Sequence, residues 1–168
     1  MGRIARLGAL TALVLTAAGL SGCGFTPLYA APGVTSGLSA VQVVAPSGRV
    51  GYLIREHLDD ALARNSALPP AYRMDVQLAE QRYPRGLRVD NVATRYEYVL
   101  TAAYSLVSLP SGAPAKKGFV RVQLTYDSAD QPYASIAAQQ DVADRAAEEA
   151  AHRIRLELAA WLASQGKG

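Results

Sequence analysis

The fold is decided by residues 50–79, VGYLIREHLDDALARNSALPPAYRMDVQLA, because the spacing of apolar residues changes in the middle of this stretch. In the first part, apolar residues recur every three to four positions, the period of an α-helix with one buried face. Pro69 and Pro70 end this pattern. From Tyr72 to Ala79 apolar and polar residues alternate, which predicts a β-strand with one buried face. The predicted helical stripe consists of Val50, Leu53, Ile54, His57, Leu58, Ala61 and Leu62.

Residues 82–95 separate this strand from the next one. They contain Pro84-Arg85-Gly86, a combination typical of turns, and we interpret them as a long turn or hairpin loop. The strand that follows also carries apolar residues on its second face, Val99 and Val107 among them, and is therefore expected inside the sheet. The other predicted elements are strands at 38–45, 96–107 and 119–126 and a long helix at 133–163.

The order of these elements, β-α-β-β-β-α, predicts an α+β fold. Two amphipathic helices need an apolar surface to cover, and the alternating strands offer one face of a sheet. We therefore expect a two-layer sandwich, with two helices packed on a four-stranded, mostly antiparallel sheet. The chain has 168 residues, half of them hydrophobic, which fits one domain and excludes a disordered protein.

The N-terminal segment has the pattern of a secretory signal. Arg3 and Arg6 precede an uncharged run at 7–20, and the sequence Leu20-Ser-Gly-Cys23 resembles the bacterial lipobox. We expect residues 1–22 to be a lipoprotein signal peptide, Cys23 to carry the lipid, and residues 23–37 to form an extended tether to a domain at 38–168. An ordinary secreted protein with a cysteine near its cleavage site is the alternative. Removing residues 1–22 lowers the formal charge from +3 to +1, which argues against a nucleic-acid partner.

The sequence offers no catalytic or metal-binding cluster. The two histidines, His57 and His152, lie on different predicted helices, and His57 is expected as a packed core or boundary residue. Cys23 is the single cysteine, which excludes a disulfide framework and a multi-cysteine metal site. No nucleophile elbow or phosphate-binding glycine loop occurs. We therefore expect no catalytic residues, no metal and no cofactor.

Basic residues cluster in the predicted loops. Within fourteen residues, four arginines are balanced by a single acidic residue, Asp90. Guanidinium groups bind phosphate and carboxylate bidentately, so this cluster suits an anionic lipid head group. A lysine pair in a later loop is expected at the same end of the sheet. Arginines that serve only solubility are the alternative interpretation. The candidate residues are Arg82, Arg85, Arg88, Arg95, Lys116 and Lys117.

The heptad 23–29, CGFTPLY, resembles the start of the LptE family, the outer-membrane lipoproteins of lipopolysaccharide assembly. The element order agrees with that family, as do Arg95-Tyr-Glu-Tyr98 at the start of a long strand and Tyr133-Ala134 before a helix with Asp141 and Arg145. One departure is that no lysine or arginine lies between Arg121 and Arg145, where some family members carry a basic residue.

The resemblance implies a non-enzymatic role at the periplasmic side of the outer membrane. Proteins of this family plug the LptD β-barrel, help it assemble and bind lipopolysaccharide. Cys23 would carry an S-diacylglyceryl group and an N-acyl chain such as palmitate, and Gly24 fits sorting to the outer membrane. Two alternatives differ in class: an auxiliary periplasmic lipoprotein of a lipid-trafficking ABC transporter, and a lipid-anchored periplasmic hydrolase.

Overall fold

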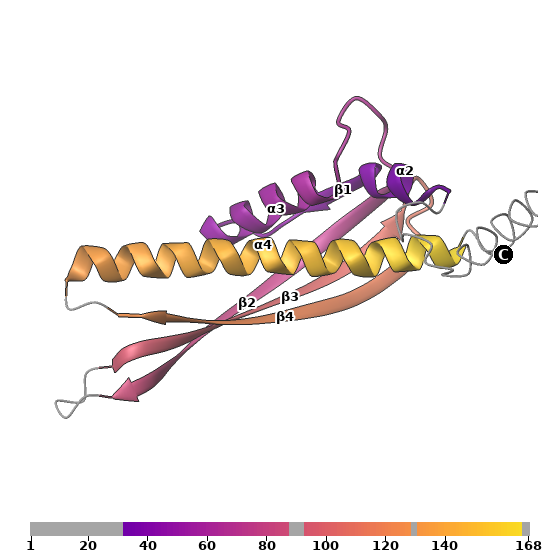
Figure 1. The fold of residues 1–168 in the computed structure, drawn as a ribbon. Helices are drawn as coiled ribbons and strands as arrows, with labels where there is room; N and C mark the ends of the chain where they lie inside the picture. Colours follow the sequence, from indigo (N-terminus) through magenta and orange to yellow (C-terminus); the bar gives the residue numbers. More distant parts are fainter. Residues whose placement is uncertain (1–31, 88–92, 129–130, 166–168) are drawn as a thin grey trace, which may run out of the picture.

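The computed structural model describes residues 32–87, 93–128 and 131–165. In this part of the chain, one short and two longer helices accompany a four-stranded sheet (Figure 1). None of the described helices combines the length and the apolar content needed to cross a membrane. The elements are α2 (Val34–Ser39), β1 (Val41–Val44), α3 (Arg49–Ala61), β2 (Tyr72–Leu87), β3 (Ala93–Ser108), β4 (Pro114–Asp127) and α4 (Pro132–Gln165).

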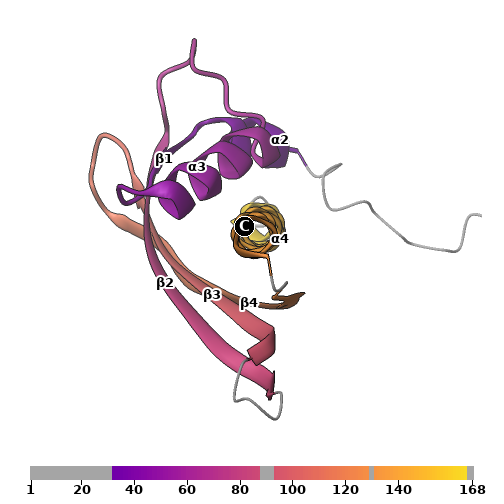
Figure 2. The ribbon, with the colours of Figure 1, turned by 90° about the vertical axis from the view of Figure 1, so that its left-hand side faces the viewer.

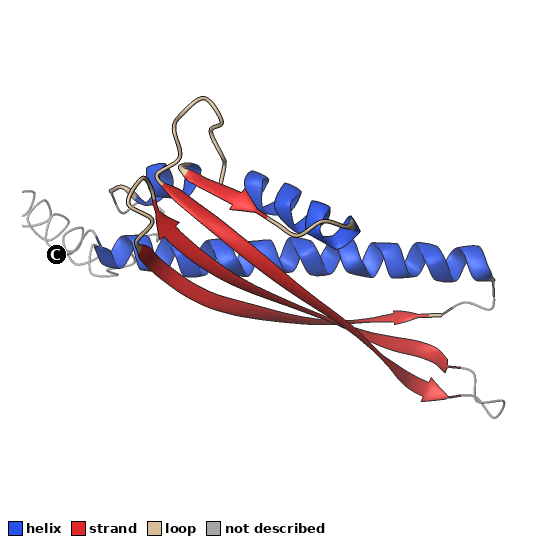
Figure 3. Ribbon diagram, turned by 180° about the vertical axis from the view of Figure 1, so that it is seen from behind, coloured by secondary structure: helices blue, strands red, loops and turns tan. Residues whose placement is uncertain are grey.

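The strand order in the sheet is β1-β2-β3-β4, and Figure 3 shows the strands in red. β1 is parallel to β2 because α3 carries the chain back between them, whereas β2, β3 and β4 pair antiparallel. β3 is an interior strand, as predicted, and Val99 on its second face is only 2% exposed. The predicted fold class, an α+β sandwich on a mostly antiparallel four-stranded sheet, is confirmed.

Both longer helices lie on one face of the sheet, and the sheet curves around α4 (Figure 2). The core forms where buried strand residues such as Met74 and Leu100 meet the predicted stripe of α3, with Ile54 and Leu58 fully buried. Burying each such side chain contributes about 1.5–3 kcal/mol. Small side chains let α4 approach the sheet closely, and four of its buried residues are Ala146, Ala147, Ala150 and Ala151.

The hairpin of β2 and β3 is longer than predicted. The prediction of a loop over residues 82–95 is wrong, because β2 continues to Leu87 and β3 begins at Ala93. Residues 81–86 are exposed on both faces, so no alternation of buried and exposed positions marks them as a strand. What makes them a strand is the ladder to β3, which pairs the backbone groups that face it. The extended conformation of residues 81–86 therefore depends on strand pairing.

Two other boundaries also differ from the prediction. The strand expected at 38–45 is shorter, and Leu38 instead belongs to α2, which also includes the last four residues of the expected tether, 34–37. Val34 and Leu38 are buried in the core, so packing rather than a local period forms this short helix. β4 begins at Pro114, which places the lysine pair in a strand rather than a loop.

Two tyrosines on β3 place their hydroxyl groups beside carboxylates. The Tyr98 hydroxyl donates to Oε2 of Glu80 on β2 at 2.7 Å, and the Tyr104 hydroxyl donates to Glu157 on α4. Both rings are buried. Burial raises the pKa of both tyrosines above the ordinary value, and the hydrogen bond to the carboxylate raises it further.

This arrangement predicts that the fold loses stability in alkali. A tyrosine in the unfolded chain ionises near pH 10, while both buried tyrosines keep their protons to higher pH. Their contribution is therefore complete below pH 10 and is lost as the pH rises above it. We expect the urea midpoint to fall between pH 9.5 and 11. In the double variant Tyr98→Phe/Tyr104→Phe the fall is expected to be shallower. Equal slopes for both proteins would contradict this prediction.

Candidate functional site

The end of the β2–β3 hairpin carries three of the four arginines noted in the sequence. Arg82 and Arg85 lie on β2, and Arg95 lies directly opposite Arg85 on β3. All three side chains are exposed, and we call them the hairpin arginines. Arg88 lies outside the described residues. The structure therefore brings the three described members of the predicted cluster together at one end of the sheet.

The hairpin arginines are divided between the two faces of the sheet. Side chains alternate along a strand, so Arg82 shares the face of buried Val76, which the helices cover. Arg85 and Arg95 are on the other, uncovered face. The sequence prediction could not separate them because it placed the segment in a loop. The cluster thus presents one guanidinium beneath the helices and two on the open sheet.

Each hairpin arginine contacts a polar side chain. Arg85 binds Glu97, Arg95 Nε lies 2.8 Å from Asp127 Oδ1, and Arg82 donates to Gln139 on α4 at 2.9 Å. The hydrogen bond to Asp127, together with its charge, raises the pKa of Arg95, which therefore stays cationic. Exposed ion pairs of this kind contribute only about 0–1 kcal/mol. The guanidinium groups can exchange these partners for phosphate at little cost.

A hollow of about 330 Å³ opens beside Arg82, between the hairpin and the helices. It combines two guanidinium groups with an exposed apolar residue: Ile136 near the start of α4 is 50% exposed, and nearby Tyr133 is 88% exposed. The sequence prediction missed Arg49 and Ile136, because only the packing of α3 and α4 brings them to this place. The lining residues are Arg49, Val50, Glu80, Arg82, Tyr98, Ile136, Gln139, Gln140 and Ala143.

The lysine pair does not join the hairpin arginines, and the expectation of a shared end is wrong. Lys117 lies opposite Ser105 on β3, ten positions from Arg95. At about 3.3 Å per residue the separation is about 33 Å. The turns that lead into β3 and β4 lie at opposite ends because consecutive antiparallel strands reverse direction. Lys116 and Lys117 also point to opposite faces, and Lys117 lines a separate hollow with Asp75.

The two histidines contact residues other than the hairpin arginines. His57 Nε2 lies 2.8 Å from Asp144 Oδ1, which links α3 to α4 at a partly buried position. His152 is exposed and its Nδ1 lies 3.4 Å from an Arg155 nitrogen. Over the described ranges, no group of three or more His, Cys, Asp or Glu side chains could hold a metal ion. Cys23, the expected lipid-attachment residue, lies outside the described residues.

The described domain is a two-layer α+β fold of the class found in solved bacterial lipoproteins. The structure of a lipoprotein from Caulobacter crescentus CB15 is 53% identical, with 79% of this chain and 97% of that chain covered and a TM-score of 0.69. Two further solved structures share the fold. Rare lipoprotein B from Shewanella oneidensis is 14% identical, with 71% of this chain and 91% of that chain covered and a TM-score of 0.54. Lipoprotein B from Nitrosomonas europaea is 16% identical, with 72% of this chain and 82% of that chain covered and a TM-score of 0.55.

The family model "LptE: Lipopolysaccharide-assembly" matches residues 38–158. The chain belongs to the LptE family, which confirms the resemblance seen in the sequence. Among curated proteins, the comparison found no match. Family membership assigns this protein to lipopolysaccharide assembly.

Proposed function

We propose that this protein is an outer-membrane lipoprotein that plugs the LptD β-barrel, helps it assemble, and binds lipopolysaccharide during its transport. The family match over residues 38–158 carries the proposal. It favours this role over an auxiliary lipoprotein of a lipid-trafficking ABC transporter and over a lipid-anchored hydrolase. The protein acts by binding and occupying space, without catalysis and without a cofactor.

The hairpin end supports lipopolysaccharide binding. Lipopolysaccharide joins phosphate groups to acyl chains, so its binding site needs cations beside apolar surface. The hairpin arginines supply exposed guanidinium groups, and the hollow beside Arg82 adds Ile136. The lysine pair at the other end is a separate candidate for anion binding, too distant to contact the same head group as Arg95.

The uncovered face of the sheet supports the role as a plug. Gln77, Thr101 and Gln123 on this face are polar and uncharged, and Arg121 opposite Thr101 and the exposed ring of Phe119 lie beside them. Such a surface suits the water-filled interior of a large β-barrel, which is also polar. Inside a barrel, such a surface would contact the wall through direct and water-mediated hydrogen bonds. The helix layer shields the apolar core on the opposite face (Figure 2).

The lipid anchor would lie at the other end of the domain from the hairpin arginines. α2 begins at Val34 and packs near the C-terminal end of α4, where a Cβ at Gly37 would lie 2.9 Å from Leu162. The eleven residues from Cys23 to Val34 can span at most about 40 Å. Acyl chains on Cys23 would therefore hold the α2 end at the periplasmic leaflet while the hairpin arginines project away from it.

Depletion of the protein tests the proposed function. Without it, the LptD barrel is expected to accumulate in a misassembled form with incorrectly formed disulfides, because its lumen is left unfilled. The measurement is the mobility of LptD on non-reducing gels, with expression of the unaltered chain as the rescue control. Normal LptD maturation in depleted cells would refute the plug role.

A further inference from the structure

β4 is an edge strand whose two halves differ in how they are protected. No described strand pairs with its outer side. Its first half contains Pro114 and the lysine pair, features that keep edge strands from pairing with other chains. Arg153 on α4 then donates through Nη1 to the Arg121 carbonyl oxygen at 3.1 Å, which occupies one outward-pointing group. From Gln123 onward none of these features occurs among the described residues.

The register identifies the backbone groups that point outward in this second half. The Ser128 N–H donates to the Thr94 carbonyl oxygen at 2.9 Å, so these two residues form a hydrogen-bonded pair. Bonding alternates along an antiparallel ladder, so even-numbered β4 residues face β3 in this region. The N–H and C=O groups of Gln123, Thr125 and Asp127 therefore point away from the sheet.

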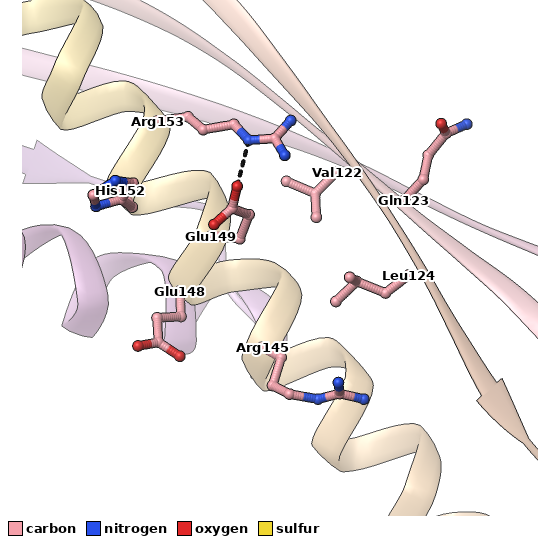
Figure 4. A pocket seen from close by; sticks show the side chains of 8 residues that line it. All are labelled: Val122, Gln123, Leu124, Arg145, Glu148, Glu149, His152 and Arg153. Carbon is pink, nitrogen blue, oxygen red and sulfur yellow. Dashed lines mark hydrogen bonds and ion pairs between the residues drawn. The ribbon is translucent and has the colours of Figure 1, made fainter.

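A groove of about 560 Å³ runs between this edge and α4. Figure 4 shows Val122 and Leu124 pointing from β4 toward α4, while Gln123 points to the other side of the strand. Leu124 is only partly buried, so a neighbouring strand would extend the apolar face over it. Within residues 32–87, 93–128 and 131–165, no hydrogen bond pairs these outward backbone groups, and the groove places the apolar side chain of Leu124 beside them.

The charges in the groove indicate the chemistry of the occupant. Arg153 Nε lies 2.7 Å from Glu149 Oε1, so Glu149 neutralises the charge of Arg153. Figure 4 marks this pair with a dashed line. Arg145 extends from α4 on the side of Leu124. Its own partner is Asp141, an exposed residue one helical turn earlier, and Arg145 Nε lies 2.9 Å from Asp141 Oδ2. That exposed pair is weak, which leaves Arg145 able to bind an acidic side chain. Two separated arginines that share the groove with Glu148 and Glu149 do not form a site for a lipid phosphate cluster.

We propose that the free edge at Gln123–Asp127 binds an extended segment of a partner polypeptide, which adds a fifth strand to the sheet and places an acidic side chain beside Arg145. The partner is the barrel protein of the proposed function, so this inference rests on that function. A regular row of outward N–H and C=O groups matches another extended backbone. The Arg153 contact marks where the added strand ends.

The test compares two variants of one position in the full lipidated chain. Thr125→Pro removes the outward N–H and leaves the ladder to β3 intact, since proline is tolerated on edge strands. Thr125→Val is the matched control that keeps the N–H. We expect Thr125→Pro to lower co-purification of the barrel protein about fivefold, the loss of one hydrogen bond, and Thr125→Val to leave it unchanged. In the unaltered complex, amide exchange at 123, 125 and 127 should be slower than in the isolated chain.

Three outcomes overturn the inference. If the barrel protein co-purifies but these amides exchange at unchanged rates, the edge is free and the proposed function stands without it. If exchange in the isolated chain slows with concentration, a second copy occupies the edge instead. If the unaltered chain captures no barrel protein, the proposed function fails and this inference fails with it. Should Thr125→Pro not fold, the exchange measurement on the unaltered chain decides.

Discussion

Replacing Gly51 by alanine is expected to leave little folded protein. Gly51 lies in the first turn of α3, and a Cβ there would come within 1.9 Å of the Pro46 carbonyl oxygen. This neighbour is backbone, so the clash can be relieved only by moving the β1–α3 connection or the helix. Overpacking costs about 1–3 kcal/mol and occasionally more, and a clash with backbone belongs at the upper end of this range, a large part of the roughly 5–15 kcal/mol that stabilises a domain.

Gly37→Ala is the matched control for this effect. A Cβ at Gly37 would approach Leu162 at 2.9 Å, but the contacting atoms are the methyl ends of a flexible side chain. A rotamer change relieves that contact, and alanine is about 1 kcal/mol better than glycine within a helix. We expect urea unfolding, followed by circular dichroism, to show a large loss for Gly51→Ala and a small change for Gly37→Ala. Equal midpoints for the two variants would contradict the close approach of α3 to Pro46.

Removing the two outer-face hairpin arginines is expected to weaken lipopolysaccharide binding about tenfold or more. In Arg85→Ala/Arg95→Ala, two cations are lost and their partners, Glu97 and Asp127, become uncompensated. This part of the surface would then carry negative charge and would repel the phosphate groups that the arginines attract in the unaltered protein. At about 1 kcal/mol for each exposed charge contact, two contacts give a loss of this size. The fold should persist, because both guanidinium groups are exposed and pairs of this kind contribute little to stability.

The control for this variant changes charge on the same face at the far end. Arg73→Ala leaves Asp75 uncompensated in the same way, since Arg73 binds Asp75 at 3.0 Å. Equilibrium binding of lipopolysaccharide should be close to normal in this control, whereas Arg82→Ala reports on the hollow under the helices. An equal loss in Arg73→Ala would indicate non-specific attraction and would rule out the hairpin arginines as the site.

The predicted elements differ in how well local pattern defines them. The stripe of α3 and the alternation in the first half of β2 mark buried faces directly, and both are as predicted. The outer half of the hairpin extends past the helix layer, so its residues carry no pattern of burial. The sequence therefore predicts a loop for Arg82 and Arg85 and does not indicate their division between the two sheet faces.

The sequence alone determined the element order, the buried faces of the main helices and strands, and membership of the LptE family. Those properties depend on local spacing of apolar residues and on a short motif. Tertiary structure alone decided that Lys117 lies about 33 Å from Arg95, that Arg49 and Ile136 share a hollow, and that no described strand pairs with the outer edge of β4. The reason is physical: burial leaves a periodic trace in the chain, whereas the direction and neighbours of each strand depend on contacts between distant residues.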